Sequence, residues 1–221
     1  MITALFSLLL LVGQALAGPG SVAVLYFQNQ GNPELEPLKV GLSQMMTTDL
    51  VGAGGAKVVE RVQLQSVLDE LKLGHSAVVD KDTSAKVGKL LGAEYLVLGS
   101  YFSLGGTLRV DARLVRVETG EIVHAFGQNG AVGDLFDLER RVAASFRDRL
   151  GQLVPGAVAA LPERLAAAVG AKPLDAVMAL SEGLIALDNH ELPRARESFE
   201  RALLADPRLD EAQAQLASLK L

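Results

Sequence analysis

The sequence contains no cysteine, and it has a shortage of positive charge. Without cysteine the chain forms no disulfide, no thiolate metal site and no cysteine nucleophile. Its 21 lysines and arginines are outnumbered by 26 acidic residues, which leaves a net charge of −5. A nucleic-acid-binding protein would carry a basic stripe, and none is visible. We therefore expect no nucleic-acid partner.

Charged residues are also missing from positions 2–17, where the apolar run 4–12 ends in Ala15-Leu16-Ala17. The run is too short for a good transmembrane span, and the small residues form an A-x-A cleavage pattern. The alternative is a buried N-terminal helix. We expect a signal peptide at 1–17 and an exported protein, in the periplasm or peripheral to the outer membrane. Lipid anchoring at a cysteine is not expected.

Residues 93–128 predict three consecutive strands joined by two tight turns. Residues 95–98 form a continuous apolar run, which is typical of a strand covered on both faces. Glycines at 104–107 and 118–121 suit the turns. Between the turns, apolar residues alternate with Arg109, Asp111 and Arg113, so this strand should be half-buried with one charged face. The third strand should run from 122 to 126.

The flanking segments predict elements that cover or extend this sheet. Strands are expected at 21–27 and 57–61, a turn at 28–33, and helices at 37–50, at 64–71 with Gly74 as a stop after it, and at 82–91. An amphipathic helix at 135–150 should turn a polar side to solvent, made of Glu139, Arg140, Arg147 and Arg149. The order β-α-β-α-α-β-β-β-α predicts an α/β (α+β) fold, with a mixed sheet of about five strands flanked by helices.

Several of these segments resemble a known family. Residues 22–27 with the polar turn and helix after them, and Val58-Val59-Glu60-Arg61 before a leucine-rich helix, are similar to the CsgG-type domain of curli-secretion and related outer-membrane assembly proteins. Residues 85–100 (AKVGKLLGAEYLVLGS) and 110–123 (VDARLVRVETGEIV) resemble that family's helix-to-strand passage and hairpin. TolB N-terminal domains and penicillin-binding-protein activators share much of this architecture. The resemblance covers 21–150 and implies a non-catalytic envelope role in assembly, secretion or regulation.

The tail from residue 173 follows a different pattern. Gly183, Ala195, Phe199, Ala202 and Pro207 fall at the spacings of a tetratricopeptide (TPR) repeat. Glycine allows two helices to approach closely, while the small and aromatic residues fill the space between them. We therefore expect a TPR-like helical hairpin with a turn at 188–191 and a third helix at 209–219.

The first helix of this hairpin carries an apolar stripe with two interpretations. Its residues are Val177, Leu180, Leu184 and Leu187, at positions that normally face a ligand groove. The stripe could bind a partner peptide. Alternatively, it could dock on the α/β domain or on another subunit, because a lone repeat needs such cover.

Catalytic chemistry has little support in the sequence. His75, His124 and His190 are scattered and have no partner at ligand spacing, so we expect no metal site. Neither G-x-x-x-x-G-K nor G-x-S-x-G occurs. We predict no catalytic residue and no cofactor. The stripe of Arg109, Asp111 and Arg113 is interpreted as a solvated face or a subunit contact, with an active site as the alternative.

These observations predict a non-catalytic periplasmic or cell-envelope protein that acts through contacts with envelope proteins and that could form a homo-oligomer. A subunit of a CsgG-type secretion pore is the alternative, and a hydrolase is a third. The expected organisation is a signal peptide (1–17), a CsgG-like domain (18–151), a connector (152–172) with a short helix around 163–169, and a TPR-like region (173–221).

Export makes the first testable prediction. Cleavage after Ala17 is expected from the apolar run and the A-x-A pattern. N-terminal sequencing of the protein recovered from the periplasm should begin at Gly18. An intact Met1 in a cytoplasmic fraction would contradict the predicted localisation.

Overall fold

The structure is a computed structural model that describes residues 20–51, 53–74, 81–154 and 173–219. The predicted signal peptide at 1–17 and the short helix predicted around 163–169 lie outside the described residues.

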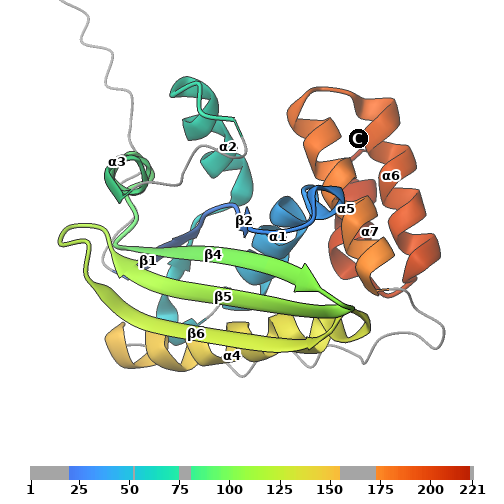
Figure 1. Cartoon of the computed structure of the whole chain (residues 1–221). Helices are drawn as coiled ribbons and strands as arrows, with labels where there is room; N and C mark the ends of the chain where they lie inside the picture. Colours follow the sequence, from blue (N-terminus) through green and yellow to red (C-terminus); the bar gives the residue numbers. More distant parts are fainter. Residues whose placement is uncertain (1–19, 52, 75–80, 155–172, 220–221) are drawn as a thin grey trace, which may run out of the picture.

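The described residues form a mixed β-sheet flanked by helices, followed by three helices that contact one another (Figure 1). The strands are β1 (Ser21–Val24), β2 (Gln28–Asn29), β3 (Lys57–Val58), β4 (Tyr95–Leu104), β5 (Thr107–Arg116) and β6 (Ile122–Ala131). The helices are α1 (Leu38–Leu50), α2 (Arg61–Glu70), α3 (Lys81–Leu90), α4 (Leu135–Leu153), α5 (Pro173–Asp188), α6 (Leu192–Ala205) and α7 (Asp210–Ser218).

The strand order of the sheet is β3-β1-β4-β5-β6, and the short β2 pairs with β4 beyond the end of β1. β1 runs parallel to both β3 and β4, whereas β4, β5 and β6 form an antiparallel meander. The predicted fold, a mixed sheet of about five strands flanked by helices, is confirmed. The meander turns as expected, because Gly105 and Gly106 adopt φ values of +57° and +79° that favour glycine.

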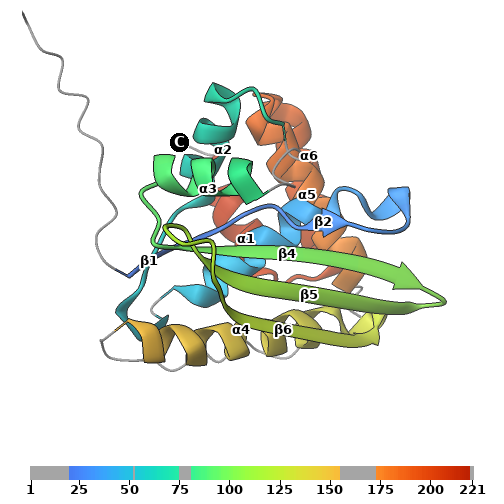
Figure 2. The ribbon, with the colours of Figure 1, turned by 60° about the vertical axis from the view of Figure 1, so that its left-hand side comes forward.

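The two faces of the sheet are covered to different extents (Figure 2). On one face α1 and α4 pack over the strands, and the buried residues there include Val97, Val110 and Phe146. On the other face α2 and α3 cover β1 and the start of β4, where Leu96 packs with Leu64 and Val87. The charged side of β5 faces away from α4 and is exposed to solvent. The sheet therefore has one closed face and one partly open face.

Some predicted boundaries are wrong. The first strand was expected at 21–27 but ends at Val24, and pairing with β4 resumes in β2, inside the segment predicted as a turn. The predicted strand 57–61 is only two residues long, because Arg61 already begins α2. β4 and β6 are longer than expected and reach Leu104 and Ala131, since their residues continue to pair with β5.

The polar side predicted for α4 is wrong at two positions. Glu139 and Arg147 are only 2% and 3% exposed. Arg147 reaches across to the end of α1, where its Nη1 donates to the carbonyl oxygens of Asp49 at 2.6 Å and Val51 at 2.9 Å. These carbonyls at the end of a helix lack intrahelical partners, and a buried arginine satisfies them. Helix periodicity alone could not reveal this neighbour. α4 also continues to Leu153, so residues 152 and 153 of the predicted connector are helical.

The core supplies a second prediction. Leu96 is 1% exposed, and a Cβ placed on Gly88 would lie 3.0 Å from its Cδ1, so the packing around it is tight. Leu96→Ala should lower the free energy of unfolding by about 2–5 kcal/mol, measured by urea denaturation. Leu104→Ala is the matched control, because Leu104 is 73% exposed and its loss should change stability by less than about 0.5 kcal/mol. Equal stability of the two variants would contradict the packing of β4.

Candidate interaction site on the open sheet face

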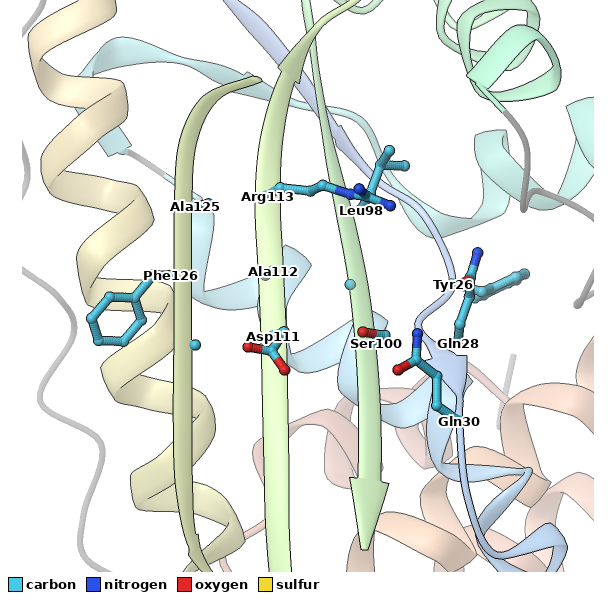
Figure 3. A pocket seen from close by; sticks show the side chains of 12 residues that line it. Tyr26, Gln28, Gln30, Leu98, Ser100, Asp111, Ala112, Arg113, Ala125 and Phe126 are labelled. Atoms are coloured by element: carbon cyan, nitrogen blue, oxygen red, sulfur yellow. The ribbon is translucent and has the colours of Figure 1, made fainter. Parts of the chain in front are cut away.

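A groove of about 410 Å³ lies over the open face of the sheet (Figure 3). Side chains from β2 and the residues around it form one side, and side chains from β4, β5 and β6 form the floor. Its polar lining comes from Tyr26, Gln28, Gln30, Ser100, Asp111 and Arg113. Phe126 borders the groove through its backbone, since its side chain points toward α4 in Figure 3.

The charged stripe of β5 forms part of this groove, as its alternation predicted. Arg109 and Asp111 make a bidentate ion pair, with Nε–Oδ2 at 2.7 Å and Nη2–Oδ1 at 2.6 Å. This pair lies flat over β6 at Gly127, where a Cβ would collide with the Asp111 carboxylate. The hydrogen bonds that Arg109 donates to the Asp111 carboxylate raise the pKa of Arg109. The two charges therefore neutralise each other within the stripe.

Arg113 differs from Arg109 because its guanidinium has no ion-pair partner within the described residues. Its side chain extends across β4 above Leu98 in Figure 3. Arg113 and Leu98 also line a smaller hollow of about 160 Å³ next to α3, whose walls are mainly apolar. The groove thus offers one unneutralised cation beside an apolar depression.

The apolar stripe predicted on the first repeat helix lies inside the protein. Val177, Leu180 and Leu184 are each 0% exposed, and Leu187 is partly buried. Val177 belongs to the core formed with α1 and α4, and Leu180 and Leu184 belong to the core beneath α2. This placement matches the docking alternative. As partner-binding residues the four remain a prediction, and in this structure the chain's own residues cover them.

The docking of α5 depends on a close helix crossing. A Cβ on Gly41 of α1 would lie 2.7 Å from Val177 Cγ1, which is shorter than real contacts allow. The Gly41 backbone N–H donates to Ser181 Oγ at 3.0 Å, and that hydroxyl donates to the Val177 carbonyl at 2.6 Å. Gly41 falls within the predicted helix 37–50, but a glycine within a helix gives no sign in the sequence of what lies opposite.

A buried ion pair also joins the α/β part of the chain to the C-terminal helices α5 to α7. Arg61 at the start of α2 donates from Nη1 to both carboxylate oxygens of Asp188 at 2.8 Å, and the two side chains are only 6% and 7% exposed. The same Nη1 lies 3.2 Å from the Tyr26 hydroxyl, which donates to Gln65 Oε1 at 2.7 Å. Burial raises the pKa of Tyr26 to about 12, so it stays neutral. No local sequence pattern predicts this network, because Tyr26, Arg61 and Asp188 are far apart in the chain.

Neither described histidine belongs to a cluster that could hold a metal, and His75 lies outside the described residues. His124 on β6 contacts Ser145 of α4, with Nε2 and Oγ 2.8 Å apart, and burial together with Arg149 lowers its pKa. His190 occupies the turn between α5 and α6 with φ of +61°. In the described part of the chain, no helix is both long and apolar enough to cross a membrane.

With the fold and groove in view, the chain can be compared with known proteins. A family model described as "Curli production assembly/transport component CsgG" matches residues 10–107. This region is similar to the CsgG family. It runs through β1, α1, α2 and β4, and it ends earlier than the predicted resemblance over 21–150. No curated protein matches the chain.

The chain is also similar to several solved structures from bacteria, among them the three that follow. The LpoB C-terminal domain from Escherichia coli is 18% identical, and the match covers 55% of this chain and 89% of that chain with a TM-score of 0.43. Lipoprotein GNA1162 from Neisseria meningitidis is 17% identical, with 58% and 96% covered and a TM-score of 0.47. The PelC dodecamer from Paraburkholderia phytofirmans is 14% identical, with 62% and 89% covered and a TM-score of 0.34.

The buried ion pair gives a third prediction. Asp188→Asn preserves the shape of the side chain but removes the carboxylate charge that Arg61 contacts. Leaving a buried guanidinium without its counter-charge should cost about 3–5 kcal/mol of unfolding free energy in chemical denaturation. The matched control is Glu182→Gln, because Glu182 pairs with Arg201 where the side chains are 35% and 51% exposed. This control should cost at most about 1 kcal/mol. Similar losses in both variants would contradict a special role for Asp188.

Proposed function

We propose that this chain is a non-catalytic protein of the cell envelope that acts through contacts with other envelope proteins, in outer-membrane assembly, secretion or regulation. The similarity of residues 10–107 to the CsgG family supports the compartment and the general process. The open sheet face carries the proposal, because beyond the part covered by α2 and α3 it presents side chains from β4, β5 and β6 that line a groove.

The groove suits a protein partner for two physical reasons. Arg113 is exposed and unneutralised, so it favours a partner with an acidic group. Nearby apolar side chains on the same face of β4 include Phe102, which is 38% exposed, and Leu104, which is 73% exposed. An arginine beside an apolar depression and an exposed aromatic side chain on the same face are typical of residues that dominate binding energy at interfaces. Arg109 and Asp111 would contribute less, because they already pair with each other.

The expected domain organisation extends this proposal. Residues 1–17 would direct export, 18–151 would form the CsgG-like domain, and 152–172 would connect it to a TPR-like region at 173–221. The helices α5 and α6 support the last assignment, because a Cβ on Gly183 would lie 2.6 Å from Phe199 Cδ1. This is the close approach that glycine and an aromatic residue at this spacing predict.

A subunit of a secretion pore is the second candidate, and the transport component named in the family description favours it. The two candidates differ in how firmly the protein associates with membranes. A protein that acts by surface contacts should leave the membrane fraction in high salt or alkaline carbonate, whereas a pore subunit should require detergent.

Site-specific photocrosslinking tests the proposed site. A photoreactive residue at Ser100, on the groove floor, should form adducts with envelope proteins in intact cells. The same residue at Leu204 is the control, because Leu204 is 85% exposed on α6, away from the groove. Arg113→Glu should reduce the Ser100 adducts several-fold by repelling an acidic partner, with an unchanged denaturation midpoint. Equal adduct patterns at Ser100 and Leu204 would contradict a specific site.

A further inference from the structure

The two edges of the sheet are protected to very different degrees. β3 forms one edge and is two residues long, with the exposed Lys57 on it. β6 forms the other edge and is ten residues long, with the sequence IVHAFGQNGA. It contains neither a charged residue nor a proline. Natural proteins usually guard an edge strand with such residues or with a cover, because unpaired backbone groups otherwise bind another strand.

The register with β5 shows which backbone groups of β6 point outward. The Val132 N–H donates to the Gly106 carbonyl at 3.0 Å, so residues 106 and 132 form a hydrogen-bonded pair of the antiparallel ladder. Inward and outward bonding alternates along a strand of such a ladder. The N–H and C=O groups that face outward therefore belong to Ala125, Gly127, Asn129 and Ala131. These four residues follow one another at every second position, so their outward-facing groups form a regular row along β6.

At the N-terminal end of β6, an outward-facing backbone carbonyl already has a hydrogen-bond partner. The register shifts next to Val123, and Arg149 of α4 donates from Nε to the Val123 carbonyl at 3.1 Å. Among the residues that the structure describes, the edge without a partner strand is therefore the stretch from Ala125 to Ala131. A strand that pairs antiparallel with this stretch in a second copy would place Ala125 opposite Ala131 and Gly127 opposite Asn129. None of these four residues is charged, so no like charges meet in this ladder.

The charges at the ends of this stretch favour a second copy as the occupant. Arg149 lies at the Val123 end, whereas the exposed Asp134 follows Ala131 by three residues at the opposite end. In this register Gly133 of each copy would fall opposite Val123 of the other, so the adjacent Asp134 would lie near the Arg149 that contacts Val123. The arrangement repeats twice by symmetry, as an isologous interface requires.

We propose that β6 pairs antiparallel with β6 of a second copy, along Ala125 to Ala131, so that the two sheets join into one continuous sheet across the dimer. This pairing uses the outward backbone groups of β6, although Ala125 and Gly127 also border the groove of the proposed function. It gives the homo-oligomer expected from the sequence a specific interface.

Sedimentation velocity of the purified chain over a concentration series tests the interface. The wild-type chain should be a dimer, and Ala125→Lys should shift it to monomer, because lysine on an edge strand blocks pairing. Leu104→Lys is the matched control, since it adds the same charge at an exposed position of β4 away from the edge, and it should remain dimeric. A wild-type monomer at all concentrations, or an assembly of any size that Ala125→Lys leaves intact, would overturn the proposal.

A charge exchange tests the choice of occupant. Asp134→Arg and Arg149→Glu should each raise the dimer dissociation constant several-fold, because each creates like charges across the interface. The double variant should recover most of the wild-type affinity. Arg149 also contacts Val123 within its own chain, so Asp134→Arg serves as the variant that leaves this bond intact. Dissociation constants unchanged by Asp134→Arg would refute the end-to-end charge pairing.

Cross-linking tests the register. The chain has no cysteine, so introduced thiols are the only ones present. Ala125→Cys combined with Ala131→Cys should give a disulfide-linked dimer under mild oxidation, since opposed Cα atoms in a hydrogen-bonded pair lie about 5.5 Å apart. The two positions are about 20 Å apart within one strand, so the cysteines cannot join within a chain. Either single variant should give little dimer. Efficient cross-linking of a single variant would contradict this register.

Discussion

The close crossing of α1 and α5 at Gly41 is the contact on which the arrangement of the two parts of the chain depends. A side chain at this position would occupy the space of Val177 and Ser181. With glycine, the backbone of α1 itself bonds to Ser181, and the two helices approach closely enough to share one core. The stripe of Val177, Leu180 and Leu184 is buried as a result. A helical hairpin too small to bury its own faces obtains the missing cover from the α/β layer.

Burial of that stripe decides which surfaces are left for partners. α1 and α4 close one face of the sheet, and the hairpin packs against α1 from the far side. Arg61 and Asp188 add a polar link at the end of α5, where two charges removed from water satisfy each other and the Tyr26 hydroxyl accepts a further bond. Within the described residues, the open face over β4, β5 and β6 and the outer edge of β6 remain. The groove and the strand edge thus arise from the same uneven coverage of a single sheet.

Local sequence patterns predicted the meander well and its neighbours less well. Alternation in β5 placed Arg109, Asp111 and Arg113 on one face, and the structure has them there, because a period of two survives wherever only one face is buried. The glycines at 105 and 106 predicted the first turn for an equally local reason. The polar side of α4 failed at Glu139 and Arg147, since the periodicity of a helix cannot reveal a distant helix end that needs a donor.

By itself, the sequence determined the order of the elements, the mixed sheet, the charged face of β5 and the close pairing of the repeat-like helices. The individual elements, the charged face and the meander depend on residues that are near one another in the chain, where propensity, periodicity and turn chemistry act directly, and the mixed sheet was inferred from the order of the elements. Only the tertiary structure decided that the stripe on α5 is covered, that Arg61 meets Asp188, that Arg113 stands beside an apolar hollow, and that β6 ends the sheet. These depend on contacts between residues far apart in the chain, such as Arg61 with Asp188 at a separation of 127 and Gly41 with Ser181 at a separation of 140. Such contacts are set by how whole elements pack, and no local pattern encodes them.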